Sequence, residues 1–387
     1  MKHLQHLILL GTLFILFGCQ EAAVQTFAEA EKTAESWAFT AFEKADSINP
    51  ILNPSPQLKF EDPITKTELF WEERNVLNPS AIVKGDSVYL FYRAQDKMGT
   101  SRIGMATSAD GLHFSKSPTP VFYPDNDTMN IYEWNYKKRT GEPIEDCVSC
   151  YFDGVEDPRI IESEDGIYFM TYTAYDGRTA RLAIASSKDL TNWTKHGLIL
   201  KDATYKEMWS KSGAIVVEEK NGKNIAKKID GKYWMYFGDT NLFIATSTDL
   251  INWEVSTNAE NQKMISVLNP RMGYFDSRLV EPGPFALYTD EGIVLIYNGS
   301  NAANYNDPAL PKFTYAAGQA LFDKDMPYKL LDRTESYFIH PDKDYEKVGE
   351  VNLVCFVEGL VHFKNQWFLY YGTADSKIAV AVHSEIE

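Results

Sequence analysis

Residues 164–193 read EDGIYFMTYTAYDGRTARLAIASSKDLTNW, and this stretch shows the pattern that decides the fold. An acidic turn ending in Gly166 leads into an aromatic-rich strand at 167–172. A second strand, rich in Ala and Ser, covers 182–187, and the segment 189–193 (DLTNW) closes the unit. Turn residues between short apolar runs predict antiparallel strands joined by tight turns.

The same pattern occurs five times between residue 70 and the C-terminus. Its aromatic-rich strands end 60 to 80 residues apart, at Tyr92, Tyr172, Phe237, Tyr297 and Tyr371. The closing segment recurs at 249–253 as DLINW. Five antiparallel units without intervening helices predict an all-β, five-bladed β-propeller. A β-sandwich is the alternative, but it would not require a fivefold recurrence.

Composition narrows the function. The chain has 387 residues and a formal net charge of −16, which argues against binding to nucleic acid. Aromatic residues make up 13% of the chain. Such residues are frequent both in β-strands and in sugar-binding clefts. Four cysteines cannot form a disulfide framework at this length, and the isolated pair Cys147 and Cys150 is weak evidence for metal. We expect no metal and no cofactor.

The first residues indicate export. Residues 1–18, MKHLQHLILLGTLFILFG, have the length of a signal peptide, and Gly18 precedes Cys19 as in a bacterial lipobox. We expect Cys19 to be acylated and to anchor an exported lipoprotein in the membrane, facing the periplasm or the cell surface. An ordinary secretory signal is the alternative. We divide the chain into a signal peptide (1–18), a tether and N-terminal extension (19–69), and a catalytic propeller (70–387). A short helix over 36–44 could pack Phe39 and Phe42 on the main body.

Polar residues begin the innermost strand of each predicted blade, and in a propeller these strand starts converge on one mouth of the central channel. The five starts are Asn78-Pro79, Glu156-Asp157-Pro158-Arg159, Lys211-Ser212-Gly213, Glu281-Pro282-Gly283 and Glu358-Gly359. Carboxylates from separate blades aimed at one place are costly unless they are solvated, protonated or used in a reaction. Arg93, Asp239 and Asp375 follow the aromatic strands toward the same rim, and the combination suits a ligand rich in hydroxyl groups.

Several strings in order resemble glycoside hydrolase family 130, whose five-bladed propellers process β-mannosides as phosphorylases or as hydrolases. They are Asn78-Pro79-Ser80-Ala81, Tyr92-Arg93-Ala94, Ser101-Arg102-Ile103-Gly104, the run 154–160 (GVEDPRI), Phe275-Asp276-Ser277-Arg278 and the run 370–375 (YYGTAD). The resemblance spans residues 75–382.

The resemblance implies roles for individual residues. Asp157 matches the general acid at the glycosidic oxygen. The terminal mannosyl unit is held at positions matching Asn78, Arg93, Glu358 and Asp375. Glu156 and Arg159 flank the acid, where Arg159 could bind substrate or the two could form a structural ion pair.

Hydrolysis and phosphorolysis differ in the nucleophile. An inverting hydrolase needs a base carboxylate roughly 6.5–9.5 Å from the acid. A carboxylate there would repel a phosphate by about 4 kcal/mol at 4 Å. In the hydrolytic members of the family that the sequence resembles, the base carboxylates lie near the positions of Glu281 and Asp239. Asp239 is shorter than the Glu expected at its position. Arg178 and Arg181 favour the opposite interpretation, because Arg grips phosphate, but they could equally bind the second sugar.

Export favours hydrolysis, because a sugar phosphate released outside the cytoplasm is of no use to metabolism. We therefore expect an exo-acting, inverting β-mannosidase, with β-1,2-linked manno-oligosaccharides as the best guess for its substrate. The alternatives are an inverting β-mannoside phosphorylase, a non-catalytic surface glycan-binding lipoprotein, and a five-bladed glycosidase acting on furanosides.

Overall fold

The computed structural model describes residues 37–39, 42–140 and 151–384. These belong to the compact unit that begins at Glu35. Cys19, Cys147 and Cys150 lie outside the described residues, so the expected lipid anchor and the thiol pair stay predictions. No helix in the described part of the chain has the length and apolar character needed to span a membrane.

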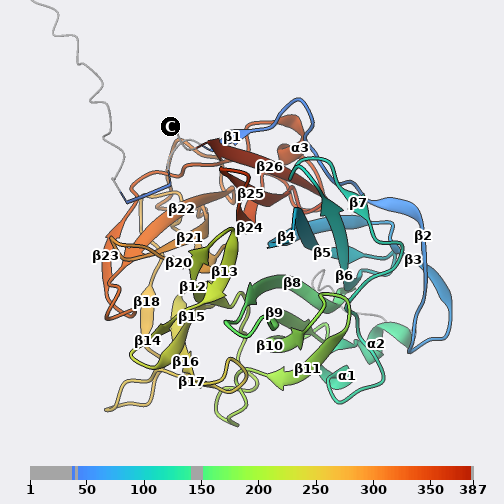
Figure 1. Cartoon of the computed structure of the whole chain (residues 1–387), viewed down its shortest axis with the longest axis horizontal. Helices are drawn as coiled ribbons and strands as arrows, with labels where there is room; N and C mark the ends of the chain where they lie inside the picture. Colours follow the sequence, from blue (N-terminus) through green and yellow to red (C-terminus); the bar gives the residue numbers. More distant parts are fainter. Residues whose placement is uncertain (1–36, 40–41, 141–150, 385–387) are drawn as a thin grey trace, which may run out of the picture. The chain divides into compact units, whose positions relative to one another are not determined.

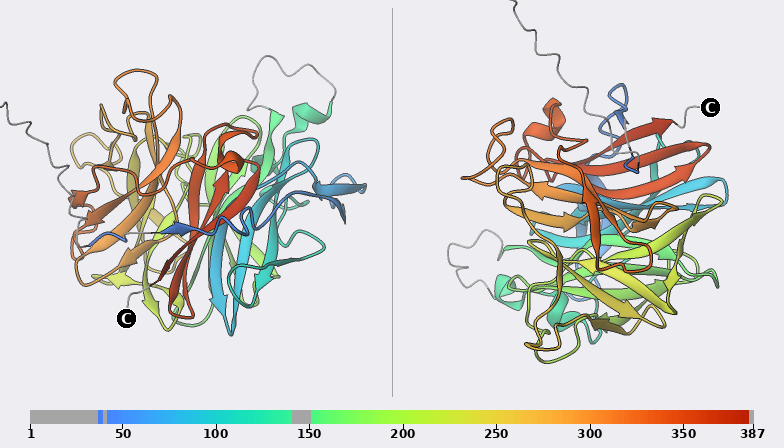
Figure 2. Two further views of the ribbon diagram at one scale, coloured as in Figure 1. Left: turned by 90° about the horizontal axis from the view of Figure 1, so that it is seen from above. Right: turned by 90° about the vertical axis from the view of Figure 1, so that its left-hand side faces the viewer.

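Five antiparallel sheets are arranged around a common centre (Figure 1), and their strands run between two faces (Figure 2). The first sheet contains β4 (Asn75–Lys84), β5 (Ser87–Gln95), β6 (Thr100–Ser108) and β7 (Ser115–Lys116). The second contains β8 (Asp153–Glu162), β9 (Tyr168–Tyr175), β10 (Ala180–Ser187) and β11 (Trp193–Leu198). The third contains β12 (Ala214–Lys220), β15 (Lys232–Phe237) and β16 (Leu242–Ser247), with β17 (Trp253–Val255) and β18 (Ser266–Leu268) at its outer edge.

In the fourth sheet β19 (Leu279–Pro282) and β20 (Ala286–Tyr288) share the inner position, followed by β21 (Ile293–Ser300), β22 (Tyr315–Phe322) and β23 (Leu330–Arg333). The fifth contains β24 (Cys355–Phe363), β25 (Gln366–Thr373), β26 (Lys377–Ser384) and β1 (Glu43–Lys44). The remaining elements are β2 (Ser55–Glu61), β3 (Glu68–Glu72), β13 (Lys223–Ala226), β14 (Lys228–Ile229), α1 (Asn130–Glu133), α2 (Tyr136–Arg139) and α3 (Asp344–Lys347). The predicted five-bladed propeller is confirmed.

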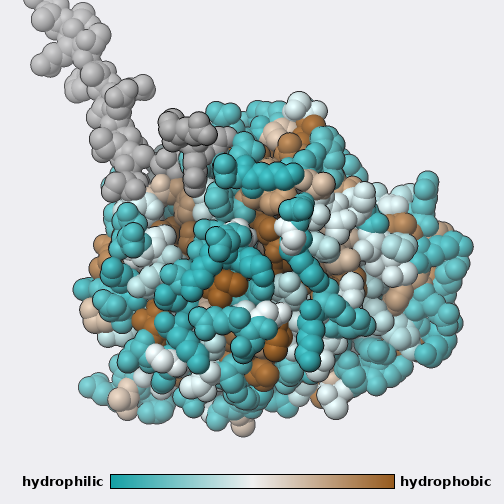
Figure 3. All heavy atoms as spheres, viewed as in Figure 1, coloured by the Kyte–Doolittle hydropathy of each residue, from teal (hydrophilic) through white to brown (hydrophobic). Residues whose placement is uncertain are grey.

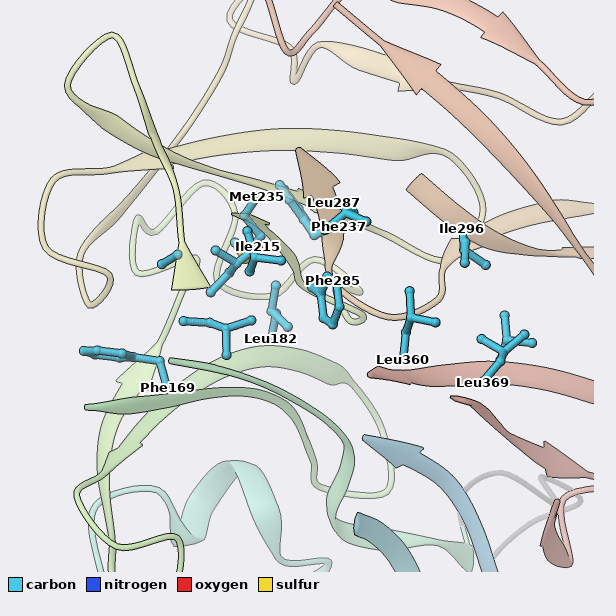
Figure 4. Close-up of a cluster of buried hydrophobic side chains, with 14 of the residues drawn as sticks. Phe169, Leu182, Ile215, Met235, Phe237, Phe285, Leu287, Ile296, Leu360 and Leu369 are labelled. Carbon is cyan, nitrogen blue, oxygen red and sulfur yellow. The ribbon is translucent and has the colours of Figure 1, made fainter. Parts of the chain in front are cut away.

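The side chains become more exposed from the inner strand of a blade to its outer strand. Every residue of the inner strand β8 is buried, whereas the outer strands β11 and β23 are largely exposed or half-buried. Apolar side chains of neighbouring blades fill the space between sheets: Phe169 and Leu182 of the second blade lie opposite Ile215 and Met235 of the third (Figure 4). Hydrophilic residues cover most of the face seen in Figure 3. Each of the four apolar clusters in the described part of the chain combines side chains from at least two neighbouring blades.

The recurring DLxNW segments form one type of turn. Ser187 Oγ accepts a hydrogen bond from the backbone N–H of Leu190, and Asp189 Oδ1 accepts from the N–H groups of Thr191 and Asn192. The equivalent bonds recur around Ser247 and Asp249. The sequence repeat therefore reflects side-chain capping of the turn before the outer strand.

The N-terminal extension differs from its prediction. The described residues between 37 and 44 form a turn and strand β1, not a helix. Phe39 and Phe42 nevertheless pack on the core. Strand β1 adds to β26, and the Asn49 side chain forms hydrogen bonds with both backbone groups of Val380. The open edge of β26 offers backbone partners that a helix could not use, so part of the extension belongs to the propeller.

Candidate active site

β-Bulges in two inner strands turn polar side chains toward the centre. In β4 the pairing shifts between Leu77 and Pro79, and Asn78 takes a φ of 47°. In β8 it shifts between Glu156 and Arg159, where Asp157 takes a φ of 50°. Asn and Asp tolerate this left-handed conformation better than most residues. A bulge re-aims the side chain it carries, and here it brings the two residues together: Asn78 Nδ2 donates to Asp157 Oδ1 at 2.8 Å.

Asp157 lies in a cationic surrounding. Arg93 Nη1 is 3.4 Å from its Oδ1, and Lys211 Nζ is 3.2 Å from its Oδ2. Burial alone would raise the pKa of Asp157, but Lys211 and Arg93 outweigh it and hold the pKa below the ordinary range. Asp157 is therefore ionised at neutral pH in the free protein.

Glu156 is the partner of Arg93. Arg93 Nη2 lies 2.7 Å from Glu156 Oε1, and Ser101 Oγ donates to the same oxygen at 3.2 Å. Burial raises the pKa of Glu156 to about 7, and Asp157 adds to the rise against the opposing effect of Arg93. The adjacent carboxyl groups thus differ: Asp157 stays charged and Glu156 titrates near neutrality.

Lys211 connects Asp157 to Glu281. Its Nζ is 3.2 Å from Glu281 Oε1, and Ser212 Oγ donates to that same oxygen. Burial raises the pKa of Glu281, opposed by Lys211. For Lys211, burial acts against the charged form, but the surrounding carboxylates, led by Glu281 and Asp157, raise its pKa well above the usual value. Lys211 is therefore a permanent cation between Asp157, the candidate proton donor, and Glu281, a candidate base.

The distance between these carboxyl groups is limited by the lysine they share. Since both oxygens are 3.2 Å from Lys211 Nζ, they lie no further apart than twice that distance. For these two oxygens, that upper limit lies just below the carboxyl separation of roughly 6.5–9.5 Å seen in inverting glycosidases. Asp157 and Glu281 face one site.

Glu358 and Arg159 form a second buried pair, at 3.4 Å between Oε2 and Nη2. Arg159 also donates to the backbone carbonyls of Pro282 and Gly283. It is thus paired with Glu358, and the alternative ion pair with Glu156 is wrong. Burial raises the pKa of Glu358 well above its ordinary value, against the opposing charge of Arg159.

The two remaining acids lie at the rim. Burial raises the pKa of Asp375 to about 6, against the opposing charge of Arg93. Asp239 Oδ2 accepts a 2.6 Å hydrogen bond from Trp209 Nε1. Asp239 also raises the pKa values of Lys211 and Glu281, which places it in the same electrostatic unit.

The two arginines expected to grip phosphate or a second sugar are not part of this cluster. Arg181 is buried, with Nη1 2.8 Å from Asp176 and Nη2 2.5 Å from Glu207. It corresponds in the blade repeat to Arg102, which is paired with Asp96 and Asp62. Arg178 is exposed, and the described residues form no ion pair with it. Ligand binding by either arginine stays a prediction.

Sequence reasoning did not assign a role to Lys211, Ser212 or Ser101. Lys211 and Ser212 occupy one of the five predicted strand starts. A lysine among inner-strand acids was therefore the available signal. Ser101 lies in one of the strings that resemble the family, but its contacts with Arg93 and Glu156 depend on the pairing of β6 with both β5 and β8.

Comparison with known proteins agrees with this geometry. Residues 43–387 match the family model of glycoside hydrolase family 130, described as beta-1,4-mannooligosaccharide phosphorylase. The chain belongs to glycoside hydrolase family 130. A 1,2-beta-oligomannan phosphorylase of Thermoanaerobacter sp. (strain X514) is 30% identical to it over 328 residues, covering 82% of this chain and 92% of the relative.

Two solved structures are more similar to this chain in sequence than the Thermoanaerobacter relative is. A glycosyl hydrolase from Bacteroides ovatus is 42% identical, with a TM-score of 0.84 and coverage of 90% of this chain and 95% of its own. The same values hold for a structure described with family 130 glycoside hydrolases that target beta-1,2 mannosidic linkages in Candida mannan. The beta-1,2-mannobiose phosphorylase from Listeria innocua, 21% identical with a TM-score of 0.65, covers 89% of this chain and 96% of its own and shares the fold. This family 130 protein is an enzyme acting on β-mannosides.

Proposed function

We propose that this protein is an exo-acting, inverting β-mannoside hydrolase, with β-1,2-linked manno-oligosaccharides as its substrate class. The observation that carries the proposal is the set of carboxyl groups opposite Asp157. The positive charge of Lys211 interacts with Glu281 and Asp239 as well as with Asp157. Three carboxyl groups therefore share one cation. A phosphate dianion at this place would face those acids, and each unit charge repels another by about 4 kcal/mol at 4 Å in a partly screened site.

In this mechanism Glu281 activates a water molecule and Asp157 delivers a proton to the leaving oxygen. Asn78, Arg93, Glu358 and Asp375 would hold the terminal mannosyl unit. Asp157 is ionised in the free protein, so it can act as an acid only if its pKa rises when substrate binds. Exclusion of water by the sugar acts in that direction, because burial disfavours the charged form.

The relatives support two outcomes. The curated relative at 30% identity is named a phosphorylase, and the structural relative at 42% identity is described among hydrolases acting on beta-1,2 linkages. The phosphorylase is therefore the second candidate, and Lys211 together with exposed Arg178 is the observation in its favour. We further propose export as a lipoprotein through Cys19, which suits a hydrolase because its products are uncharged.

The products decide between the two candidates. Purified protein is incubated with β-1,2-mannobiose and separately with β-1,4-mannobiose, with and without inorganic phosphate, and followed by NMR. We expect phosphate-independent cleavage of the β-1,2 substrate in which α-mannose appears first from the terminal unit. Release of mannose 1-phosphate at a rate that depends on phosphate would overturn the hydrolase. Binding without turnover would instead support a glycan-binding protein.

A further inference from the structure

Trp209 presents an open aromatic face beside the site. It lies in the segment between β11 and β12, and 49% of its surface is exposed although Ser210 and Ser212 nearby are buried. Residues 201–204, 207 and 208 of the same segment are exposed as well, but a large aromatic ring would gain more than they would from burial. The exposed ring is therefore available to a ligand.

The ring is held in place from two sides. Its Nε1 donates the 2.6 Å hydrogen bond to Asp239 Oδ2, and Tyr175 contacts it edge-on at 5.9 Å between ring centroids, with an interplanar angle of 69°. A fixed ring loses little conformational freedom when a ligand stacks on it. Trp209 therefore has the properties of a preformed platform.

A pocket of about 500 Å³ opens next to this ring. It is lined by Trp209, Gly238, Asp239, Thr240, Asn241 and Phe243. Its volume falls within the range of small-ligand sites, and its lining combines aromatic rings with hydrogen-bonding groups. The apolar face of a sugar ring can stack on the aromatic rings, and its hydroxyl groups can bind the hydrogen-bonding groups.

The pocket is linked to the cluster around Lys211 by Asp239, which lines the pocket. Trp209 precedes Lys211 by two residues, and Asp239 influences both Lys211 and Glu281 electrostatically. A sugar in this pocket would thus lie next to the Glu281 side of the site. The pocket has no cation in its lining, which suits an uncharged ligand.

We infer that Trp209 is the platform for the sugar unit that leaves, a neutral hexopyranose, and that Asp239 positions the Trp209 ring instead of acting as the base. This inference rests on the proposed cleavage of β-mannosides. Asp239 Oδ2 is engaged by the indole N–H, and its other oxygen remains available for a sugar hydroxyl group. The role of base then falls to Glu281 alone.

The test compares kcat and KM for β-1,2-mannobiose among variants of the full chain. Trp209→Ala is expected to raise KM at least tenfold with a smaller fall in kcat, and Trp209→Phe, which keeps a ring but loses the N–H, is expected to fall in between. Asp239→Asn keeps an oxygen that accepts the indole N–H, so KM should rise less than in Asp239→Ala, whereas loss of the charge that acts on Lys211 and Glu281 should lower kcat by less than about 100-fold. Asp239→Ala removes that acceptor and should raise KM toward the Trp209→Ala value.

Tyr328→Ala serves as the matched control, because Tyr328 is an aromatic residue of similar exposure that is not part of the site. Thermal unfolding of each variant checks the fold. An unchanged KM in Trp209→Ala would overturn the platform. A fall in kcat of about 100-fold or more in Asp239→Asn would overturn the positioning role, since that is the loss expected for a base. Phosphate-dependent cleavage by the wild type would overturn the proposed hydrolase but not the platform, because the leaving sugar is the same in both reactions.

Discussion

Lys211 Nζ lies 3.2 Å from Asp157 Oδ2, so the candidate proton donor of the reaction is ion-paired in the free enzyme. The same nitrogen contacts Glu281, the candidate base. One cation thus influences the protonation of both groups, and its removal has a predictable direction.

Lys211→Met should move the pH dependence of kcat/KM to higher pH. Without the cation the charged forms of Asp157 and Glu281 lose a stabilising partner, so both pKa values rise. A base with a raised pKa is protonated at low pH, so activity should fall more at pH 5 than at pH 8. The measurement is kcat/KM across that interval. Lys220→Met, at an exposed lysine, is the control, and an acidic limb that does not move would contradict the assigned role of Lys211.

Glu358→Gln should stabilise the fold increasingly as pH rises. Burial raises the pKa of Glu358 well above its usual value of 4.5, so the folded protein binds a proton that the unfolded chain releases above that pH. The wild type therefore loses stability as pH rises from about 4.5 toward the folded pKa, and a glutamine does not titrate. The difference in free energy of unfolding between variant and wild type, measured in urea from pH 4 to pH 8, should grow with pH. A difference that is constant over this range would show that the pKa of Glu358 is not raised in the folded protein.

Arg102→Met should cost about 3–5 kcal/mol of folding free energy, because it leaves two buried carboxylates without their partner. Arg102 is 2.6 Å from Asp62 and 2.8 Å from Asp96, and all three side chains are buried. Lys59→Ala removes an ion pair with Glu68 in which both side chains are more than half exposed, and it should cost less than about 1 kcal/mol. Urea unfolding measures both. Equal effects of the two variants would refute the distinction.

Asn49→Ala should weaken the attachment of the N-terminal extension to strand β26 of the fifth blade. Its side chain accepts from the N–H of Val380 at 2.9 Å and donates to the carbonyl of Val380 at 2.8 Å. Two hydrogen bonds of about 1 kcal/mol each predict a loss of about 2 kcal/mol. Exposed Asn53, mutated to Ala, provides the comparison. Hydrogen exchange at β26 should accelerate in the first variant only, and unchanged protection there would count against this attachment.

Local patterns were sufficient to predict the blades. Turns such as 164–166 and the DLxNW segments depend on neighbouring residues, so their meaning is readable in the sequence. The recurrence of those units implied the ring. It also implied that Asp157 and Glu281, more than a hundred residues apart, would meet.

The features that could not be predicted depend on contacts between distant segments. Pro79 and Pro158, directly after Asn78 and Asp157, are compatible with bulges, but the position of each bulge is defined by the register with the next strand. The ion pair between Arg181 and Glu207 could not be predicted either, because the two residues are 26 positions apart in the chain. Residues 43–44 read as helix because their actual partner, β26, lies at the other end of the chain.

The pairing of β1 with β26 also has a consequence for biosynthesis. Because the first of the described strands pairs with the last, the fifth sheet remains incomplete until β26 has been synthesised. During translation β26 is missing, so the nascent chain exposes unsatisfied strand edges for as long as elongation continues.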